Sequence, residues 1–274
     1  MQILKAFFRF YISSSIHVAL SVVSLLSLTY LKFEVSPDFN LYIFVFLACI
    51  TGYNFVKYAP VARLHHRSLT QQLRIIQLFS LLCFLGLVVN SLFVGIEVIY
   101  FSTVLGLLNL LYAVPVYKRN LREVPLLKVF LIATIWSSVT VVFPFLEENR
   151  TEAFDVYWSF ELVERFFIVV LLMVPFEVRD YPYDKAYLKT IVSSLGLIRT
   201  KILSMIVIIG LLLIRWLIFE PDEILFYVLL YLSLSYVIII SRLNQKAYFS
   251  SFWVEGLPVF WLILAFIFFS DIFY

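Results

Sequence analysis

The sequence Pro175-Phe-Glu-Val-Arg-Asp-Tyr-Pro-Tyr-Asp-Lys185 lies between two long apolar runs, Phe166–Val174 and Ile202–Ile214. Each run belongs to a segment that is long and apolar enough to predict a membrane-spanning helix. Charges at the ends of such helices are costly and are usually kept for a function. From residue 175 to residue 201 the chain carries three carboxylates and five cations, which are Glu177, Asp180, Asp184, Arg179, Lys185, Lys189, Arg199 and Lys201. We interpret this stretch as one half of a binding site at the membrane surface.

The composition of the whole chain agrees with a membrane protein. Of its 274 residues, 63% are hydrophobic and only 14% are charged, and the mean hydropathy is +0.98. Soluble domains carry about 25% charged residues. Apolar runs recur along the full length, so the predicted fold class is all-α, a polytopic helical bundle. Nothing in this composition predicts a nucleic-acid partner.

The apolar runs predict nine spans within a single membrane domain, residues 1–274. The first span is expected to remain attached, because no small-x-small cleavage site follows it. The predicted spans are roughly 10–31, 41–56, 75–94, 96–114, 129–146, 158–176, 202–219, 224–241 and 252–270.

The connections between these spans predict an orientation. If the N-terminus is cytoplasmic and the sides alternate, all but four of the 21 Lys and Arg residues fall on the cytoplasmic side. The four on the opposite side are Lys32, Arg150, Arg165 and Arg215. This asymmetry follows the positive-inside rule. We therefore expect an integral protein of a bacterial inner (plasma) membrane, with the N-terminus cytoplasmic and the C-terminus outside.

The two aspartates of the quoted stretch have a spacing that suits metal binding. Asp180 and Asp184 are four residues apart, so on a helix their carboxylates share one face. Two such carboxylates next to phosphate groups suit Mg²⁺, and Glu177 lies one turn earlier. Pro182 is expected to break the helix. A solvated loop with local ion pairs, such as Arg179–Glu177 or Asp184–Lys185, is an equal alternative.

Two further stretches carry cations near span ends. In Asn109–Lys128, Pro115 ends the fourth span and is followed by cations that suit phosphate groups or, equally, lipid head groups. In Gly52–Arg74, Asn54 and Lys57 lie near the membrane surface, and Arg67 could reach a phosphate.

Taken together, these residues resemble the UbiA-type superfamily of intramembrane prenyltransferases. Asp180-x-x-x-Asp184 follows the sixth predicted span, where that family carries its second aspartate-rich motif. Tyr112-x-x-Pro115-x-x-Lys118-Arg119 and Pro125-Leu-Leu-Lys128 are similar to the family's stretch after the fourth span. The family's first motif is Asn-x-x-x-Asp-x-x-x-Asp. Here Asn54 matches the asparagine, but Tyr58 and Ala62 replace the aspartates.

The resemblance implies a UbiA-like bundle with a central apolar cavity and a Mg²⁺-assisted transfer of a prenyl group at the cytoplasmic face. The donor is an isoprenoid diphosphate, and the acceptor is hydrophobic or aromatic. Asp180 and Asp184 would be catalytic and, with Glu177, would hold Mg²⁺. The implied substrate contacts are Asn54, Arg67, Tyr112, Lys118, Arg119, Lys128 and Lys185.

The missing aspartates leave a second interpretation open, a catalytically impaired relative that binds a polyprenyl lipid or scaffolds a membrane complex. A transporter is a third interpretation. It is less favoured because no unpaired charge is expected at mid-membrane positions and no internal repeat is visible.

Overall fold

The computed structural model describes residues 2–64, 71–114, 124, 126–148, 154–184, 190–219, 224–246 and 248–268, with the backbone alone for 59–64, 183 and 184. In these ranges the chain forms helices and turns and no strand, as the all-α prediction requires. The contacts divide the chain into two compact units. Unit 1 comprises Met1–Arg122 and Phe143–Arg150, and unit 2 comprises Glu123–Val142 and Thr151–Tyr274. The single domain stays a prediction.

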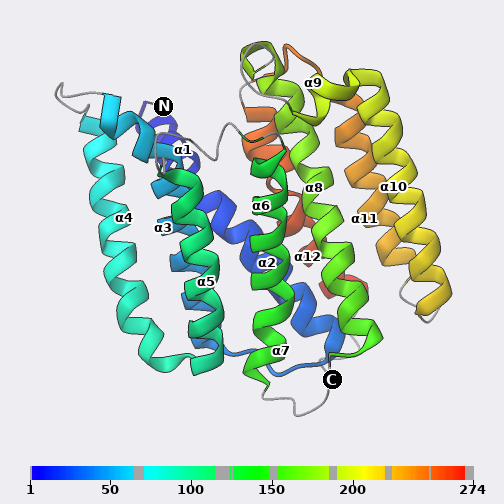
Figure 1. Ribbon diagram of the computed structural model, residues 1–274, viewed down its shortest axis with the longest axis horizontal. Coiled ribbons are helices and arrows are strands. Elements are labelled where there is room, and N and C mark those ends of the chain that lie inside the picture. The colour runs from blue at the N-terminus through cyan, green and yellow to red at the C-terminus, as the bar shows by residue number, and fades with distance from the viewer. Residues whose placement is uncertain are drawn as a thin grey trace. The chain divides into compact units, whose positions relative to one another are not determined.

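Unit 1 is organised around one long helix, α3 (Phe39–Leu64), which packs against α2, α4 and α5 (Figure 1). Ala19, Ile50 and Cys83 form a small buried cluster where α2, α3 and α4 meet. The helices of this unit are α1 (Gln2–Ser13), α2 (Ile16–Phe33), α3, α4 (Gln71–Asn90), the 3₁₀ turn η1 (Ser91–Phe93), α5 (Ile96–Ala113) and α7 (Phe143–Glu147).

Unit 2 is organised around α8 (Val156–Asp184), which packs against α6, α10 and α11. Its buried side chains include Trp158 and Ile168 of α8 and Leu234 of α11. The other helices are α6 (Leu127–Ser137), the π-helix η3 (Ser138–Val142), α9 (Ile191–Leu195), α10 (Leu197–Ile218), α11 (Ile224–Ile240), the π-helix η5 (Phe249–Val254) and α12 (Leu257–Phe268).

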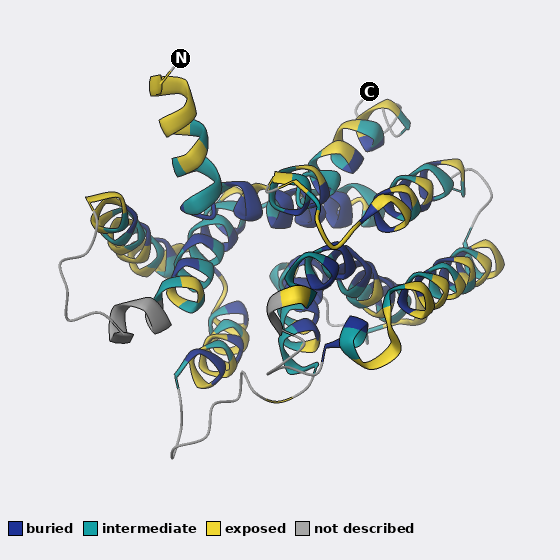
Figure 2. Ribbon diagram, turned by 90° about the horizontal axis from the view of Figure 1, so that it is seen from above, coloured by how far each residue is buried: buried dark blue, intermediate teal, exposed yellow. Residues whose placement is uncertain are grey.

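The outward faces of several helices are apolar and exposed. Figure 2 shows long exposed stripes along the helices, and Leu217 of α10, for example, is 76% exposed. Such faces are unfavourable in water and suit lipid chains. Among the described residues, seven helices are long and apolar enough to cross a membrane: Ile16–Phe33, Phe39–Tyr58, Gln71–Phe93, Ile96–Ala113, Leu127–Glu147, Leu197–Ile218 and Phe249–Phe268.

The predicted count of nine spans is therefore not established. The two other predicted spans, 158–176 and 224–241, fall on α8 and α11. Helix α11 has 17 residues and is apolar except for Ser233 and Ser235. Helix α8 is long, but it contains Glu161, Glu164 and Arg165 within the predicted span. The chain is an integral membrane protein with at least seven helices of membrane length.

The first predicted span, 10–31, is corrected by the structure. The helix is interrupted at Ser15, which has a left-handed backbone with φ of 63°, and α2 begins at Ile16. The preceding helix α1 has no buried residue and combines exposed Ile3, Leu4 and Phe7 with Lys5 and Arg9. This composition is typical of a helix that lies in the membrane interface.

The predicted break at Pro182 is also wrong. Helix α8 continues through Pro175 and Pro182 and ends at Asp184. Pro182 lies in the last turn, so its missing N–H interrupts the helix only where it ends. Val178, which lies between the two prolines, is fully buried, so the helix is packed in this region. Asp180 and Asp184 therefore belong to one helix.

Candidate functional site

The end of α8 brings a carboxylate and two cations together in unit 2. Asp180 accepts two hydrogen bonds from Arg179, from Nε at 2.8 Å and from Nη2 at 3.2 Å. Lys128 Nζ, in the first turn of α6, lies 3.6 Å from Asp180 Oδ2. The side chains of Lys128 and Asp180 are 38% and 25% exposed. We refer to Lys128, Arg179 and Asp180 as the charged cluster, and it is open to a ligand.

This cluster bears on both sequence interpretations of the stretch. Lys128 was expected to contact the substrate, and it lies next to the acid that was expected to be catalytic. The loop alternative predicted a pair between Arg179 and Glu177, whereas Arg179 pairs with Asp180. The guanidinium also lies 5.2 Å from the centre of the Phe176 ring, which restrains its position.

Glu177 accepts a hydrogen bond from the backbone of a neighbouring helix. Its side chain is buried, and Oε2 accepts a hydrogen bond of 3.0 Å from the backbone N–H of Ile191. Ile191 is the first residue of α9. Thr190 also caps this helix, because its side chain accepts from the backbone N–H of Ser193 and its backbone N–H donates to Ser193 Oγ. Glu177 therefore anchors the start of α9 to α8.

The described carboxylates do not by themselves form the Mg²⁺ site that the resemblance implies. Glu177 is buried and binds the backbone at the start of α9, and Asp180 is paired with two cations. Within the described part of the chain, no group of three His, Cys, Asp or Glu side chains is arranged to hold a metal ion. The side chain of Asp184 lies outside the described residues, and Mg²⁺ binding stays a prediction.

In unit 1, Asn54 makes internal hydrogen bonds with all its polar groups. Its Oδ1 accepts from Ser15 Oγ at 2.8 Å, and its Nδ2 donates to Ser14 O at 3.0 Å and to Ser80 Oγ at 2.7 Å. The side chain is buried. Asn54 thus stabilises the break between α1 and α2.

The neighbours of Asn54 serve the same break. Tyr58 donates its hydroxyl to Ser13 O at 2.8 Å, and Lys57 Nζ donates to the same oxygen at 3.2 Å. The carbonyl of Ser13 belongs to the last turn of α1, where helical partners are lacking. Where the family carries its first aspartate, this chain uses a tyrosine to hold two helices. The side chain of Ala62 is outside the described residues.

The remaining predicted substrate contacts are placed only in part. Tyr112 is buried near the end of α5 in unit 1. Near it, Asn109 Nδ2 approaches Gly52 so closely that a Cβ there would lie 3.1 Å away, so a larger residue would require the Asn109 side chain to shift slightly. Arg67, Lys118, Arg119 and Lys185 lie outside the described residues.

Lys201, one of the cations of the opening stretch, caps a helix. Its Nζ donates to Ile239 O and to Ser241 O, each at 2.7 Å. These carbonyls lie at the end of α11, where a cation is favourable. Lys201 therefore ties α10 to α11.

A buried charge network at the other end of α8 is the main feature that sequence reasoning missed. Arg165 and Arg215 were counted as charges outside the membrane, but both are buried within helices of unit 2. Arg165 Nη2 donates to Glu161 Oε1 at 2.6 Å, and Arg215 binds Glu161 at 3.1 Å and Glu164 through Nε at 2.8 Å and through Nη2. Tyr231 donates to Glu164 at 2.7 Å.

This network joins α8, α10 and α11. It contains two acids and two cations, so its net charge is zero, which makes its burial tolerable. One signal was present in the sequence, since Glu161 and Arg165 are four residues apart on one helix. The partner across the bundle, Arg215, follows 50 residues after Arg165 and could not be paired from spacing.

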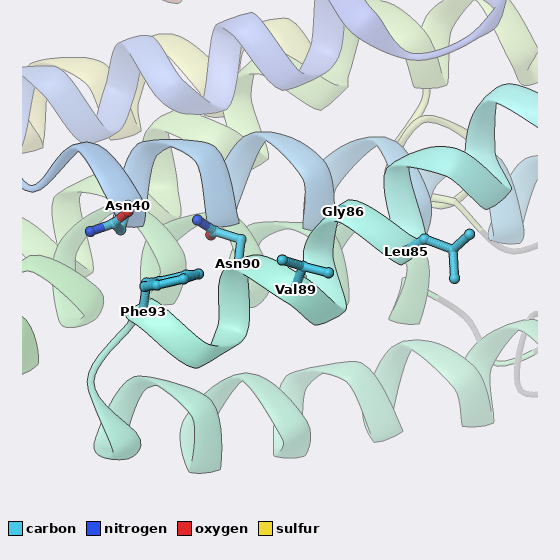
Figure 3. Close-up of a pocket in the computed structure, with 6 residues that line it drawn as sticks. All are labelled: Asn40, Leu85, Gly86, Val89, Asn90 and Phe93. Atoms are coloured by element: carbon cyan, nitrogen blue, oxygen red, sulfur yellow. The ribbon is translucent and has the colours of Figure 1, made fainter.

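One pocket of about 510 Å³ lies in unit 1, between α3 and the end of α4 (Figure 3). Figure 3 shows Asn40, Asn90 and Phe93 gathered at one end of it. It is lined by Asn40, Leu85, Gly86, Val89, Asn90 and Phe93, and it contains none of the predicted site residues.

No protein-family model and no curated protein matches the sequence. Two solved structures are similar in fold. A UbiA homologue from Archaeoglobus fulgidus, bound to DMAPP and Mg²⁺, aligns with a TM-score of 0.61 and 14% identity over 96% of this chain and 99% of its own. Digeranylgeranylglyceryl phosphate synthase aligns with a TM-score of 0.56 and 15% identity over 99% of this chain and 98% of its own. The chain therefore has the fold of the UbiA-type prenyltransferases, as the resemblance implied.

Proposed function

We propose that this protein transfers a prenyl group from an isoprenoid diphosphate to a hydrophobic or aromatic acceptor within the membrane. The observation that carries the proposal is the charged cluster of Lys128, Arg179 and Asp180 at the end of a membrane-length helix. The likeness in fold to a UbiA homologue bound to DMAPP supports the class of substrate.

In the proposed reaction, the bond between the allylic carbon and the diphosphate oxygen breaks. A bond from the acceptor to that carbon forms, the acceptor loses a proton, and inorganic diphosphate leaves. Lys128 and Arg179 neutralise the charge that develops on the leaving diphosphate. Arg179 offers two parallel N–H donors, which now bind Asp180 and would bind phosphate oxygens in the same geometry.

Several finer features belong to this proposal. They are a central apolar cavity for the prenyl chain, a site on the cytoplasmic face of a bacterial inner membrane, and Mg²⁺ at Asp180 and Asp184. Mg²⁺ accompanies DMAPP in the similar A. fulgidus structure. Because the described donors do not by themselves form a metal site, no step above depends on the ion.

A protein that binds the isoprenoid without transferring it is the second candidate. Its motivation is that Asn54 and Tyr58, which lie at the position of the family's first motif, make hydrogen bonds within the protein at the break after α1.

The test uses the full chain in lipid nanodiscs. Prenyl diphosphates of increasing length, from DMAPP upward, are supplied with a membrane-lipid extract or simple phenols, in Mg²⁺ and in EDTA. We expect release of inorganic diphosphate and a prenylated product, both reduced by Lys128→Met. Lys246→Met, an exposed lysine in the loop after α11, is the matched control. Binding without release at any chain length would support the second candidate, and absence of binding would exclude both.

A further inference from the structure

Helix α1 runs in a different direction from the other helices of unit 1. In Figure 2, α3, α4 and α5 are seen nearly end-on, whereas α1 is seen from its side and extends away from them. None of its residues is buried. Because α3, α4 and α5 each have the length and apolar composition to cross a membrane, a helix that lies across them runs along the membrane plane.

The direction of α1 is fixed by contacts at its C-terminal end. The left-handed backbone at Ser15 ends its alignment with α2. Asn54 and Tyr58 of α3 then bind the backbone of the residues just before this break. The Phe10 ring also packs edge-on against Phe79 of α4, with 5.4 Å between the ring centres. These contacts join α1 to two membrane-length helices and set the angle at which it leaves them.

The two sides of α1 differ in character. Lys5 and Arg9 are four residues apart, so they share one face of the helix, and both are exposed. Neither cation forms an ion pair within the part of the chain that the structure describes. The helical period puts Ile3, Leu4 and Phe7 on the other face, where they are 87%, 72% and 66% exposed. An apolar face and a cationic face on one exposed helix suit a membrane surface.

The charges of unit 1 are separated by sign along its helices. The end that contains α1, the end of α3 and the start of α4 carries only cations among the described side chains, and these are Lys5, Arg9, Lys57 and Arg74. Lys57 lies against α1, because its Nζ donates to Ser13 O. The described charges of the opposite end are mainly acids, and they are Glu34, Asp38, Glu97, Glu147, Glu148 and Lys32. The end that holds α1 therefore attracts an anionic surface.

We propose that α1 binds the anionic phospholipids of the bilayer surface. Ile3, Leu4 and Phe7 enter the boundary of the acyl chains, and Lys5 and Arg9 contact lipid phosphate groups. A second copy of the chain seated on the apolar face would leave the cations without partners. Free phosphate would leave the apolar face in water. The proposal does not depend on prenyl transfer, because the charged cluster belongs to unit 2.

The test measures hydrogen exchange of the α1 backbone by mass spectrometry. The full chain is placed in nanodiscs of phosphatidylcholine alone or of phosphatidylcholine mixed with phosphatidylglycerol. Each cation near an anionic surface strengthens binding about fivefold. With two cations, we expect exchange of α1 to slow by at least about fivefold when phosphatidylglycerol is present. The difference is expected to shrink as NaCl is added, because salt screens exposed charges.

The variants separate the charged face from the apolar face. The double variant Lys5→Gln with Arg9→Gln is expected to exchange equally in the two kinds of nanodisc. Phe7→Ser is expected to exchange faster than the parent in both. Lys32→Gln, at the opposite end of unit 1, is the control that keeps the parent's difference.

Equal exchange of the parent in the two kinds of nanodisc would overturn the proposal, and so would a difference that survives in the double variant. Protection of α1 that rises with protein concentration in phosphatidylcholine alone would overturn it in favour of a second copy. Protection by inorganic phosphate in detergent, equal to that in anionic nanodiscs, would overturn it in favour of a soluble anion.

Discussion

Replacing Asp180 by Asn is expected to strengthen the binding of diphosphate when no metal is present. In the structure Asp180 holds Arg179 through two hydrogen bonds and lies 3.6 Å from Lys128 Nζ. A diphosphate that binds these cations has to displace the carboxylate or share them with it. Asparagine has the same shape and no charge, so it removes this competition.

The size of the effect follows from the geometry. Unit charges at about 4 Å attract each other by about 1 kcal/mol in a water-like medium. Exposed ion pairs are worth about 0–1 kcal/mol when measured. Because the side chains of Lys128 and Asp180 are 38% and 25% exposed, the water-like value applies to this pair. A gain of about 1 kcal/mol is roughly a fivefold lower dissociation constant, and release of Arg179 as well would bring it to about tenfold.

The assay is calorimetric titration of the full chain with inorganic diphosphate in EDTA. The parent is compared with Asp180→Asn, Lys128→Met and the double variant. Lys128→Met is expected to bind about fivefold more weakly, and the double variant measures how far the two side chains are coupled. The titrations are then repeated in Mg²⁺.

A weaker affinity of Asp180→Asn than of the parent in EDTA would refute the reasoning. Loss of a Mg²⁺-dependent gain in the same variant would show instead that Asp180 is a metal ligand, as the resemblance implies. Competition by Asp180 therefore predicts tighter diphosphate binding by Asp180→Asn in EDTA. A role of Asp180 as a metal ligand predicts weaker binding by the same variant in Mg²⁺.

Three further predictions concern stability, each measured by thermal and denaturant unfolding in detergent. Arg215→Met is expected to destabilise the chain by about 3–5 kcal/mol because it leaves buried carboxylates uncompensated. Trp216→Leu, at an exposed residue, is the control and is expected to have little effect. Equal losses of stability in the two variants would contradict the charge network. Asn54→Leu is expected to lose about 2 kcal/mol because Ser14 O and Ser15 Oγ lose partners, and an unchanged midpoint would contradict that role. Gly196 has φ of 80°, so Gly196→Ala is expected to cost about 1–3 kcal/mol although its Cβ would meet no atom within 4 Å. A neutral result there would mean that the turn relaxes.

The positions of the apolar helices could be predicted from the sequence because a membrane permits few alternatives. Backbone groups in hydrocarbon need internal hydrogen bonds, so a long apolar run becomes a helix. The predicted start of span four, residue 96, is the start of α5. The predicted first span is wrong because Ser15 has a left-handed backbone, which interrupts the helix. The apolar run around it contains no glycine or proline that would have marked this position.

The candidate site could be predicted as a set of residue types but not as a set of contacts. Lys128 follows the fourth predicted span and Asp180 follows the sixth, and the structure brings these two residues together in unit 2. The internal roles of Glu177, Asn54 and Lys201 could not be read from the sequence. Each depends on a partner from another helix or helix terminus, and a motif carries no information about it.

The two ends of α8 show why a charge near a membrane is not by itself evidence of a site. Near its start, Glu161 and Glu164 are matched by Arg165 and Arg215, and all four are buried. A closed and neutral network of this kind stabilises packing but offers nothing to a ligand, because each group would lose its partner on exchange. About 28 Å further along the helix, Asp180 is partly exposed and faces two cations. There an incoming anion can replace the carboxylate as partner of Arg179 without leaving a buried charge. It is this exposed and exchangeable pairing, rather than the number of charges, that supports the proposal of a diphosphate site at the end of α8.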